Sequence, residues 1–559
     1  MNRDVKVPTW IRKRDGRLAP FDPDRICQAL FAASERLGQP NAFLARELTD
    51  SIVHFLAQET TDQPPTTSDL AEVITKVVRE MGHPALAQNF AMRTRSDPDR
   101  SMPPAAIDGV APPHVLTKAA ASIPLSEISL TEVFPRNLVA AHREGILTLT
   151  GLEHPFELAG TVINRACDQS RSGMGIHEAI EAAREYTGNF VAIDGPDYAL
   201  AQIDGEPHDL AREFAIELSA ALRSVGLSAI VNLGVAQPPD WARDLSDGPL
   251  FAEFRQTLEP ARVAALAEAL LSKLLACQQH DGESVSLAWH LSSDDFMPDA
   301  RSRLQSLARI ALDGGTLEFI FDRPRKPVAL GGGLTRREPA LLLAVGVHLP
   351  RLIDARAAAS SDNYLAKVGT LARLARSAGH AKQDFLRRRG RAPITNGFLL
   401  DRARLLVVPV GLEFVVRELT SQSLCDGGAG TQFGVQIVRR LREALSAGKR
   451  QNLEAVLDAF PRPLTPLADT HILKERAGLQ VADAGISPRH QLHAATALRV
   501  SGGSMATLAI PAEPDFSTIE AAALLQYAWT QTEISRLRFE RAAQPGRQLS
   551  APWEGQDTT

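Results

Sequence analysis

Cysteine is scarce in this chain of 559 residues, and the four that occur lie far apart: Cys27, Cys167, Cys277 and Cys425. No Cys-x-x-Cys pair is present, which argues against a zinc ribbon and against a fold held together by disulfides. We therefore expect no structural zinc and a reducing compartment.

Long apolar runs and an excess of basic charge are also missing. The longest apolar stretch, residues 339–350, is too short to span a bilayer, and no apolar core typical of a signal peptide opens the chain. Lys and Arg number 61 against 66 Asp and Glu, a formal net charge of -5, so no strong basic field is available for nucleic acid. The composition predicts a cytoplasmic protein with no membrane or general nucleic-acid partner.

The first distinctive feature is a basic hairpin near the start of the chain. Two short β-compatible runs flank Asp15-Gly16, a pair favoured in tight hairpin turns. Three cations precede the turn, and alternation along a strand places Lys13 on the face opposite Arg12 and Arg14.

Helical patterns follow this hairpin. Asp22 or Asp24 can cap a helix that starts near Arg25, and residues 45–58 carry an apolar stripe. Residues 67–69 have the composition of a cap for a helix over 70–81, and a last short helix is expected over 84–93. Residues 1–95 are thus predicted to form a β-hairpin plus a helical bundle.

The Lys-Arg-Asp-Gly hairpin and the helices after it resemble the ATP-cone, the nucleotide-sensing domain of ribonucleotide reductases. The resemblance implies an adenine-nucleotide effector, ATP or dATP with Mg²⁺, surrounded by the hairpin and the start of the next helix. The nucleotide-binding residues that it nominates are Lys13, Arg14, Asp15, Gly16, Phe21, Asp22, Arg25, Ile26 and Thr67. Cationic side chains supply the charge-assisted hydrogen bonds that a triphosphate needs. The alternative is a basic hairpin that is only solvated.

Residues 96–125 are rich in Pro, Ala and Ser and are expected to form a linker, whereas residues 544–559 are expected to be a disordered tail. Between them, over 126–543, short β-type runs alternate with long amphipathic helices. The expected strands are 145–150, 229–235, 284–290, 317–321, 344–348 and 405–410. This alternation predicts a parallel sheet with helices outside it, an α/β fold.

Three short stretches in this region resemble the anaerobic, glycyl-radical class of ribonucleotide reductase. They are residues 135–145, which end in His-x-x-Gly, residues 345–351, which end in His-Leu-Pro-Arg, and residues 501–508, with a Gly-Gly pair. The resemblance implies a ten-stranded α/β barrel of two half-barrels that follows the ATP-cone.

The sequence departs from that family where the chemistry takes place. The family's radical cysteine precedes the Leu-Pro-Arg strand end, but residues 328–334 contain none. The glycyl-radical segment Arg-x-x-Gly-Tyr and its four metal-binding cysteines do not occur, and Thr148 to Leu152 replaces His-x-His-Asp-Leu. A missing reactive atom cannot be replaced by positioning alone.

We therefore expect a catalytically silent relative, a pseudoenzyme that responds allosterically to adenine nucleotides. By resemblance it forms a homo-oligomer and has a ribonucleotide reductase or another protein as a partner. The alternative is an active reductase subunit that uses Cys277 or Cys425, with a glycyl radical supplied by another chain. A repressor built from an ATP-cone and a zinc ribbon is disfavoured by the missing cysteine pairs. The run Gly331-Gly332-Gly333 either cradles a phosphate or forms a plain loop.

Overall fold

The computed structural model describes residues 10–13, 17–21, 23–37, 42–58, 64–95, 124–163, 175–239, 259–281, 284–314, 317–353, 361–390, 394, 399–446, 453–461, 464, 486–498, 505–510 and 516–541. Most of the expected linker and all of the expected tail lie outside these residues. The chain divides into two compact units, residues 1–123 and residues 124–559.

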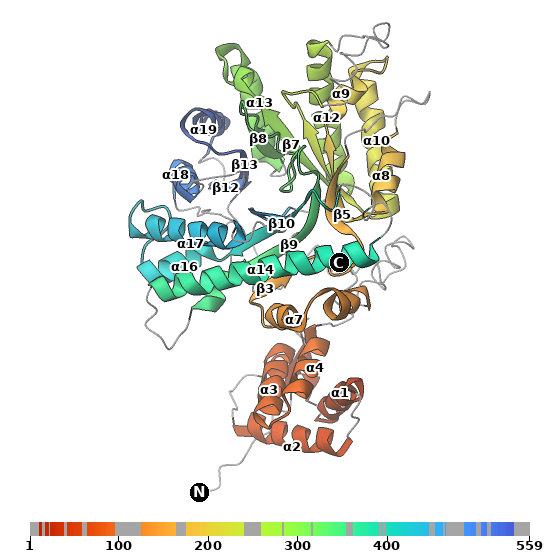
Figure 1. Ribbon diagram of the computed structural model, residues 1–559, viewed down its shortest axis with the longest axis vertical. Coiled ribbons are helices and arrows are strands. Elements are labelled where there is room, and N and C mark those ends of the chain that lie inside the picture. The colour runs from red at the N-terminus through yellow and green to blue at the C-terminus, as the bar shows by residue number, and fades with distance from the viewer. Residues whose placement is uncertain are drawn as a thin grey trace, which may run out of the picture. The chain divides into compact units, whose positions relative to one another are not determined.

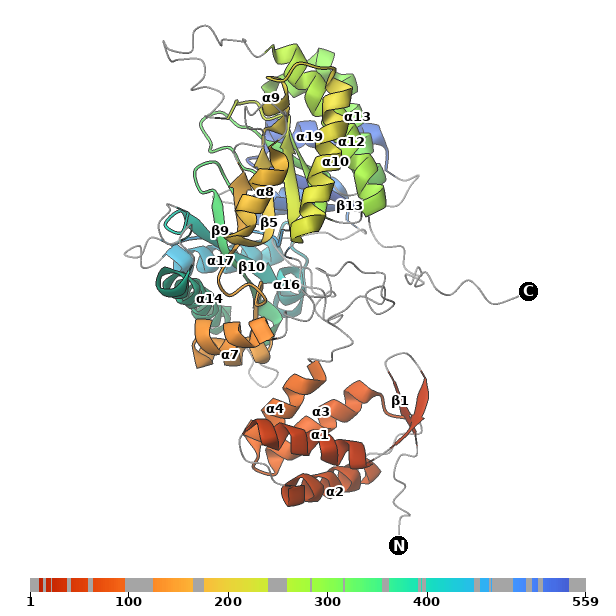
Figure 2. The same cartoon turned by 90° about the vertical axis from the view of Figure 1, so that its right-hand side faces the viewer.

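The smaller unit is a hairpin joined to four helices; Figure 1 labels the helices and Figure 2 shows the hairpin at β1. Its elements are β1 (Trp10–Arg12), β2 (Leu18–Pro20), α1 (Pro23–Arg36), α2 (Ala42–Gln58), α3 (Thr67–Glu80) and α4 (Pro84–Arg95). The strands pair antiparallel, with Ile11 opposite Ala19. The expected hairpin plus helical bundle is confirmed.

Apolar side chains from all four helices form the core of this unit, for example Leu30, Ile52, Val78 and Phe90. The start of α3 differs from the prediction by one residue. Its N-cap is Thr66 rather than Thr67, because the Thr66 side chain accepts a hydrogen bond from the Asp69 N–H while Asp69 accepts one from the Thr66 N–H.

The larger unit is built on one extended sheet. Its strands are β3 (Leu147–Leu149), β4 (Leu158–Ile163), β5 (Thr187–Asp194), β6 (Ser228–Leu233), β7 (Val285–Leu291), β8 (Leu317–Phe321), β9 (Ala340–His348), β10 (Ala403–Val410), β11 (Glu454–Leu457), β12 (Met505–Ile510) and β13 (Arg536–Arg541). The hydrogen-bonded order is β11-β10-β9-β4-β5-β6-β7-β8-β13-β12, with β3 added to β9.

Strand direction divides these ten ordered strands into two sets. Strands β4 to β8 run parallel to one another and form the first set. Strands β9 to β11 are parallel to one another, as are β12 and β13. Both of these groups are antiparallel to the first set, because β9 pairs antiparallel with β4 and β13 pairs antiparallel with β8, so together they form the second set. This is the expected ten-stranded α/β barrel of two half-barrels.

Helices cover the outer surface of the sheet. They are η2 (Ser129–Val133), α7 (Arg136–Arg143), α8 (Ile176–Arg184), α9 (Pro196–Leu200), α10 (Pro207–Val225), α12 (Pro260–Asp281), η4 (Ser293–Phe296), η5 (Pro298–Ala300), α13 (Arg301–Gly314), η6 (Leu349–Leu352), α14 (Ser361–Arg389), α16 (Leu412–Thr420), α17 (Ala429–Ser446), α18 (Pro488–Leu498) and α19 (Thr518–Gln531). None of the helices in the described ranges is long and apolar enough to cross a membrane.

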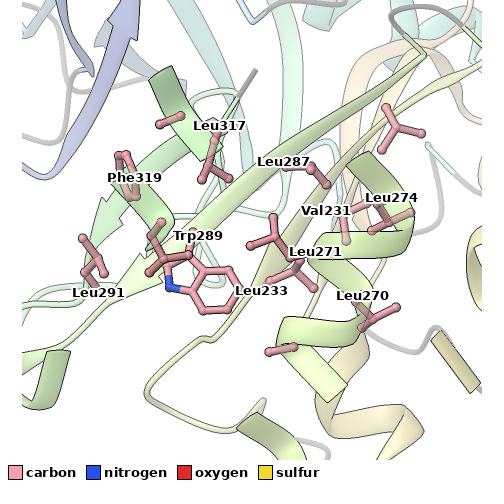
Figure 3. Close-up of a cluster of buried hydrophobic side chains, with 14 of the residues drawn as sticks. Val231, Leu233, Leu270, Leu271, Leu274, Leu287, Trp289, Leu291, Leu317 and Phe319 are labelled. Carbon is pink, nitrogen blue, oxygen red and sulfur yellow. The ribbon is translucent and has the colours of Figure 1, made fainter. Parts of the chain in front are cut away.

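Two apolar cores lie between the sheet and these helices. The first core joins β4–β8, β12 and β13 to α8, α10, α12, α13 and α19. Within it, Leu270, Leu271 and Leu274 of α12 face Val231 of β6 and Leu287 of β7 (Figure 3). The second core joins β3 and β9–β11 to α7, α14, α16 and α17, and Figure 2 shows α14, α16 and α17 grouped beside β9 and β10.

A third apolar cluster, which we call the inner cluster, fills the inside of the barrel. Strand alternation explains its membership, because Val191 and Ile193 of β5 point to the helices whereas Phe190 and Ala192 point inward. Strands β4 to β10 and the loop before β9 all contribute to this inner cluster.

Candidate nucleotide site and barrel interior

The two faces of the hairpin differ in exposure. Trp10 and Leu18 lie on the outer face and are 48% and 55% exposed, whereas Ile11 and Ala19 on the other face are half-buried. Lys13 follows β1, is exposed, and donates its backbone N–H to the Arg17 carbonyl at 2.8 Å. Because side chains alternate, Lys13 belongs to the Ile11 face.

The start of α3 lies along the edge of β1 (Figure 2). The Arg12 N–H donates to the Pro65 carbonyl at 2.9 Å, and Arg12 forms a parallel bridge with Thr66. This contact brings the end of β1, which Lys13 follows, next to the start of α3, which begins at Thr67.

The structure describes only some of the other predicted nucleotide-binding residues. Phe21 is half-buried against the helical core, and Ile26 of α1 is 5% exposed, so it is part of that core. Arg25 precedes Ile26 in α1, but its side chain lies outside the described part. The predicted residues that lie wholly outside the described ranges are Arg14, Asp15, Gly16 and Asp22.

A layer of four polar residues lies inside the barrel at the carboxyl ends of β5 to β8. Asp194 ends β5, Asn232 and His290 are the second-last residues of β6 and β7, and Asp322 follows β8. The first three residues are 0–2% exposed, and the side chain of Asp322 is 4% exposed. His290 is hydrogen-bonded through Nδ1 to Asp322 Oδ1 at 2.9 Å and through Nε2 to Asn232 Oδ1 at 3.2 Å. We call this set the polar layer. None of these four residues is among those predicted from the sequence, although each lies at or near the end of an apolar run.

The polar layer holds the loop that precedes β9. Arg336 donates to Asp194 through Nε at 2.7 Å and through Nη2 at 2.9 Å, a bidentate ion pair. The Asn232 amide donates to the Leu330 carbonyl at 3.3 Å. Burial acts to raise the pKa of Asp322, but His290 more than offsets it, so that the pKa is lowered and the carboxylate stays charged.

The tip of that loop is packed into the barrel. Leu330 and Leu334 are buried in the inner cluster, and the Leu330 N–H donates to the Leu334 carbonyl. The glycines between them have positive φ, and a Cβ on Gly331 would lie 2.8 Å from Ile230. The loop therefore has no room for larger residues here. Its glycine run lies among apolar side chains rather than around a phosphate-sized space.

The cavity below the loop tip is small. It has a volume of about 20 Å³ and is bordered by Gly332 of the loop, Ser286 of β7, Phe460 after β11, and Arg536 and Arg538 of β13. A space of this size holds about one water molecule. Small-molecule sites typically measure about 300 Å³ or more, so this cavity is too small for a nucleoside.

The stretch that departs from the reductase pattern is bonded to β9. Thr148 Oγ1 lies 2.7 Å from His348 Nε2, and Thr150 Oγ1 donates to the Ala344 carbonyl at 2.9 Å. Burial, with Arg351 and His142 adding to it, lowers the pKa of His348 to about 4, so this imidazole is neutral at pH 7.

The two described cysteine thiols lie outside the inner cluster. Cys277 packs against the core formed with α12, and Cys425 packs against the core formed with α16 and α17. Neither borders the cavity. The thiol of Cys27 and all of Cys167 lie outside the described residues. Within the part of the chain that the structure describes, no group of three or more His, Cys, Asp or Glu side chains could hold a metal ion.

Comparison with known proteins gives the same two parts. A family model of the ATP cone domain matches residues 9–97. A search of curated protein sequences found no match. The chain is similar to the anaerobic ribonucleotide reductase from Thermotoga maritima with dATP bound in the specificity site, with a TM-score of 0.55, 12% identity, and 86% of this chain and 93% of that chain covered.

The same enzyme with citrate in the active site gives a TM-score of 0.53 and 12% identity, covering 86% of this chain and 100% of that one. At this identity the likeness concerns the fold alone. Residues 9–97 thus form an ATP cone domain, and the chain has the fold of the anaerobic ribonucleotide reductases.

Proposed function

We propose that this chain is a regulatory protein that binds ATP or dATP with Mg²⁺ in its ATP cone and whose barrel does not reduce ribonucleotides. The observation that carries the nucleotide-binding part is the ATP cone match over residues 9–97. The contact between the end of β1 and the start of α3 supports it, because a triphosphate needs convergent donors from separate segments.

The buried loop before β9 supports the proposal that the barrel has no reductase activity. Residues 328–334 contain no cysteine, and their tip occupies the centre of the inner cluster. The alternative of an active subunit requires Cys277 or Cys425 near the loop tip. Both pack against the outer cores, so we do not favour this alternative.

The proposal also covers the oligomeric state, the partner protein and the cellular location. The sequence resemblance favours a cytoplasmic homo-oligomer that contacts a ribonucleotide reductase or another protein. A ligand changes such an assembly only if it binds the two states with different affinity. We expect the mass measured by light scattering to change when ATP or dATP is added. An unchanged mass with nucleotide bound would count against this form of regulation.

Calorimetric titration of ATP and of dATP into the full chain, with Mg²⁺ present, tests the nucleotide site. We expect saturable binding that is lost in a Lys13→Ala, Arg14→Ala double variant. Arg79→Ala is a matched control, because Arg79 is an exposed cation in the last turn of α3, and it should bind as the parent does. Absence of binding in the parent would refute the proposal.

A further inference from the structure

The barrel has a seam between β11 and β12. These two strands are the ends of the hydrogen-bonded order, and no ladder joins them among the described residues. Side chains bond to the edge of β12 instead. The Met505 N–H donates to Asp458 Oδ1 at 2.7 Å, and the Gln491 amide pairs with both the N–H and the carbonyl of Ala509 at 2.9 Å.

A buried ion cluster reinforces this seam. Arg536 of β13 bonds to Asp458 after β11 and to Glu318 of β8. Asp458 and Arg536 are 1% and 3% exposed. Burial acts to lower the pKa of Arg536, but the two carboxylates outweigh it and raise that pKa, so the guanidinium stays charged.

Apolar packing does not reinforce the seam from inside. The described members of the inner cluster include none from β12 or β13. The inward positions of these strands hold Thr507, whose Oγ1 has no partner within the described chain, and Arg538, whose Nε has none there either. Buried ion pairs contribute little net stability because desolvation offsets the attraction. Among the described residues the seam is therefore joined by side-chain bonds and by α18, which packs against both outer cores, rather than by a backbone ladder.

The two antiparallel junctions of the barrel are both short, and β8 and β13 share three registered pairs. Strands β4 and β9 share two registered pairs, Gly160 with Leu341 and Thr161 with Ala340. Most residues of the two outer cores divide at the β4–β9 junction, one core on β4–β8 with β12 and β13, the other on β3 and β9–β11, although Leu158 of β4 belongs to the second core and α18 contributes to both. We call β4–β8 with β12 and β13 one lobe, and β3 with β9–β11 the other. Strand pairing joins the two lobes at β4–β9, which can act as a hinge, and no strand pairing among the described residues joins them at β11–β12.

We propose that the barrel opens along the β11–β12 seam, with the bonds of Asp458 to Met505 and Arg536 as its latch. Opening separates the two lobes and uncovers the cavity below the loop tip, which Phe460 and Arg536 border on the seam side. The inference does not depend on the nucleotide proposal, because each group in it belongs to the barrel.

Hydrogen exchange on the full chain, read peptide by peptide, tests this proposal. Asp458→Asn keeps the shape of the side chain and removes its charge. We expect the amides of 454–457 and 505–510 to exchange at least about tenfold faster, because local opening sets their exchange. Amides of β5 and β6 should be unchanged.

Asp194→Asn is the matched control, since Asp194 also forms a buried pair with an arginine but lies in the polar layer. It should speed exchange around 328–336 and leave β12 as in the parent. Glu318→Gln is a milder change at the same ion cluster and replaces Asp458→Asn if that variant does not fold. It should speed hydrogen exchange in the same strands as Asp458→Asn. Unchanged exchange in β12, or equal acceleration throughout the barrel, would overturn the proposal.

Discussion

Asp197 is a buried carboxyl that folding holds in its protonated form. Its residue is 0% exposed, and Oδ2 accepts from the Gly234 N–H at 3.1 Å, whereas Oδ1 has no partner within the described residues. Burial raises its pKa from 3.8 to about 7, against the hydrogen bond from Gly234. Stability from this proton is complete below pH 4 and is lost as the pH rises through 7.

Asp197→Asn should therefore stabilise the protein most above pH 7 and progressively less as the pH falls toward 4. The amide keeps an acceptor for Gly234 and carries no charge to desolvate, and the gain is at most a few kcal/mol. Thermal denaturation of both proteins at pH 5 and pH 8 measures it. An equal difference in Tm at the two values would contradict the assignment.

Lys382 shows the opposite pH dependence. Its Nζ donates to the carbonyls of His154 and Pro155 at 2.7 and 2.8 Å, and its residue is 3% exposed. Burial lowers its pKa from 10.5 to about 7, with Glu157 and Glu153 acting in the other direction. The unfolded chain then holds more protons between pH 7 and 10.5, so the free energy of unfolding rises over that window.

Lys382→Met should remove this rise. Comparing the change in Tm between pH 7.5 and 9.5 in the variant and the parent isolates the lysine from other groups that titrate there. The absolute Tm is no guide, because methionine also leaves two carbonyls without a donor. Parallel curves for the two proteins would show that another group titrates.

Sequence reasoning reaches some of these residues and not others. The polar layer could have been predicted, since Asn232 and His290 interrupt apolar runs at their carboxyl ends, where parallel sheets place polar sites. Lys382 could not, because its acceptors lie more than two hundred residues away in sequence, and nothing local in α14 indicates them.

At the scale of elements, the loop before β9 acts as part of the core. Leu330→Ala should cost about 3–5 kcal/mol, because the side chain is fully buried and the barrel around it is rigid. Chemical denaturation of the parent and the variant measures this free energy. Arg337→Ala, in the exposed part of the same loop, should cost less than about 0.5 kcal/mol. A similar loss in both variants would mean that the loop is not packed as described.

The strands that the sequence analysis found and missed differ in composition. The runs at 229–235, 284–290, 317–321 and 405–410 are predominantly apolar, and each contains or overlaps a strand. Strand β13 was missed because its inward residues are arginines, Arg536 and Arg538, so its alternation resembles a surface segment. Strand β5 contains Gly188 and Asn189, which weaken its β pattern.

At the scale of the whole molecule, the two units should unfold separately. Each has its own apolar core. Calorimetry should show two transitions, and Mg²⁺-ATP at about 100 times its Kd should stabilise the smaller unit by about 2.7 kcal/mol while leaving the other transition in place. The Lys13→Ala, Arg14→Ala variant should lose that shift. A single transition that moves as one with ATP would contradict independent units.

The amide of Gln491 also has a consequence for solubility. An edge strand with open backbone groups is a template on which strands of other molecules can add, which is how many folded proteins begin to aggregate. On β12, Gln491 occupies the N–H and the carbonyl of Ala509 much as a neighbouring strand would. One buried side chain thus gives the barrel a margin that it can open without offering neighbouring molecules a free edge.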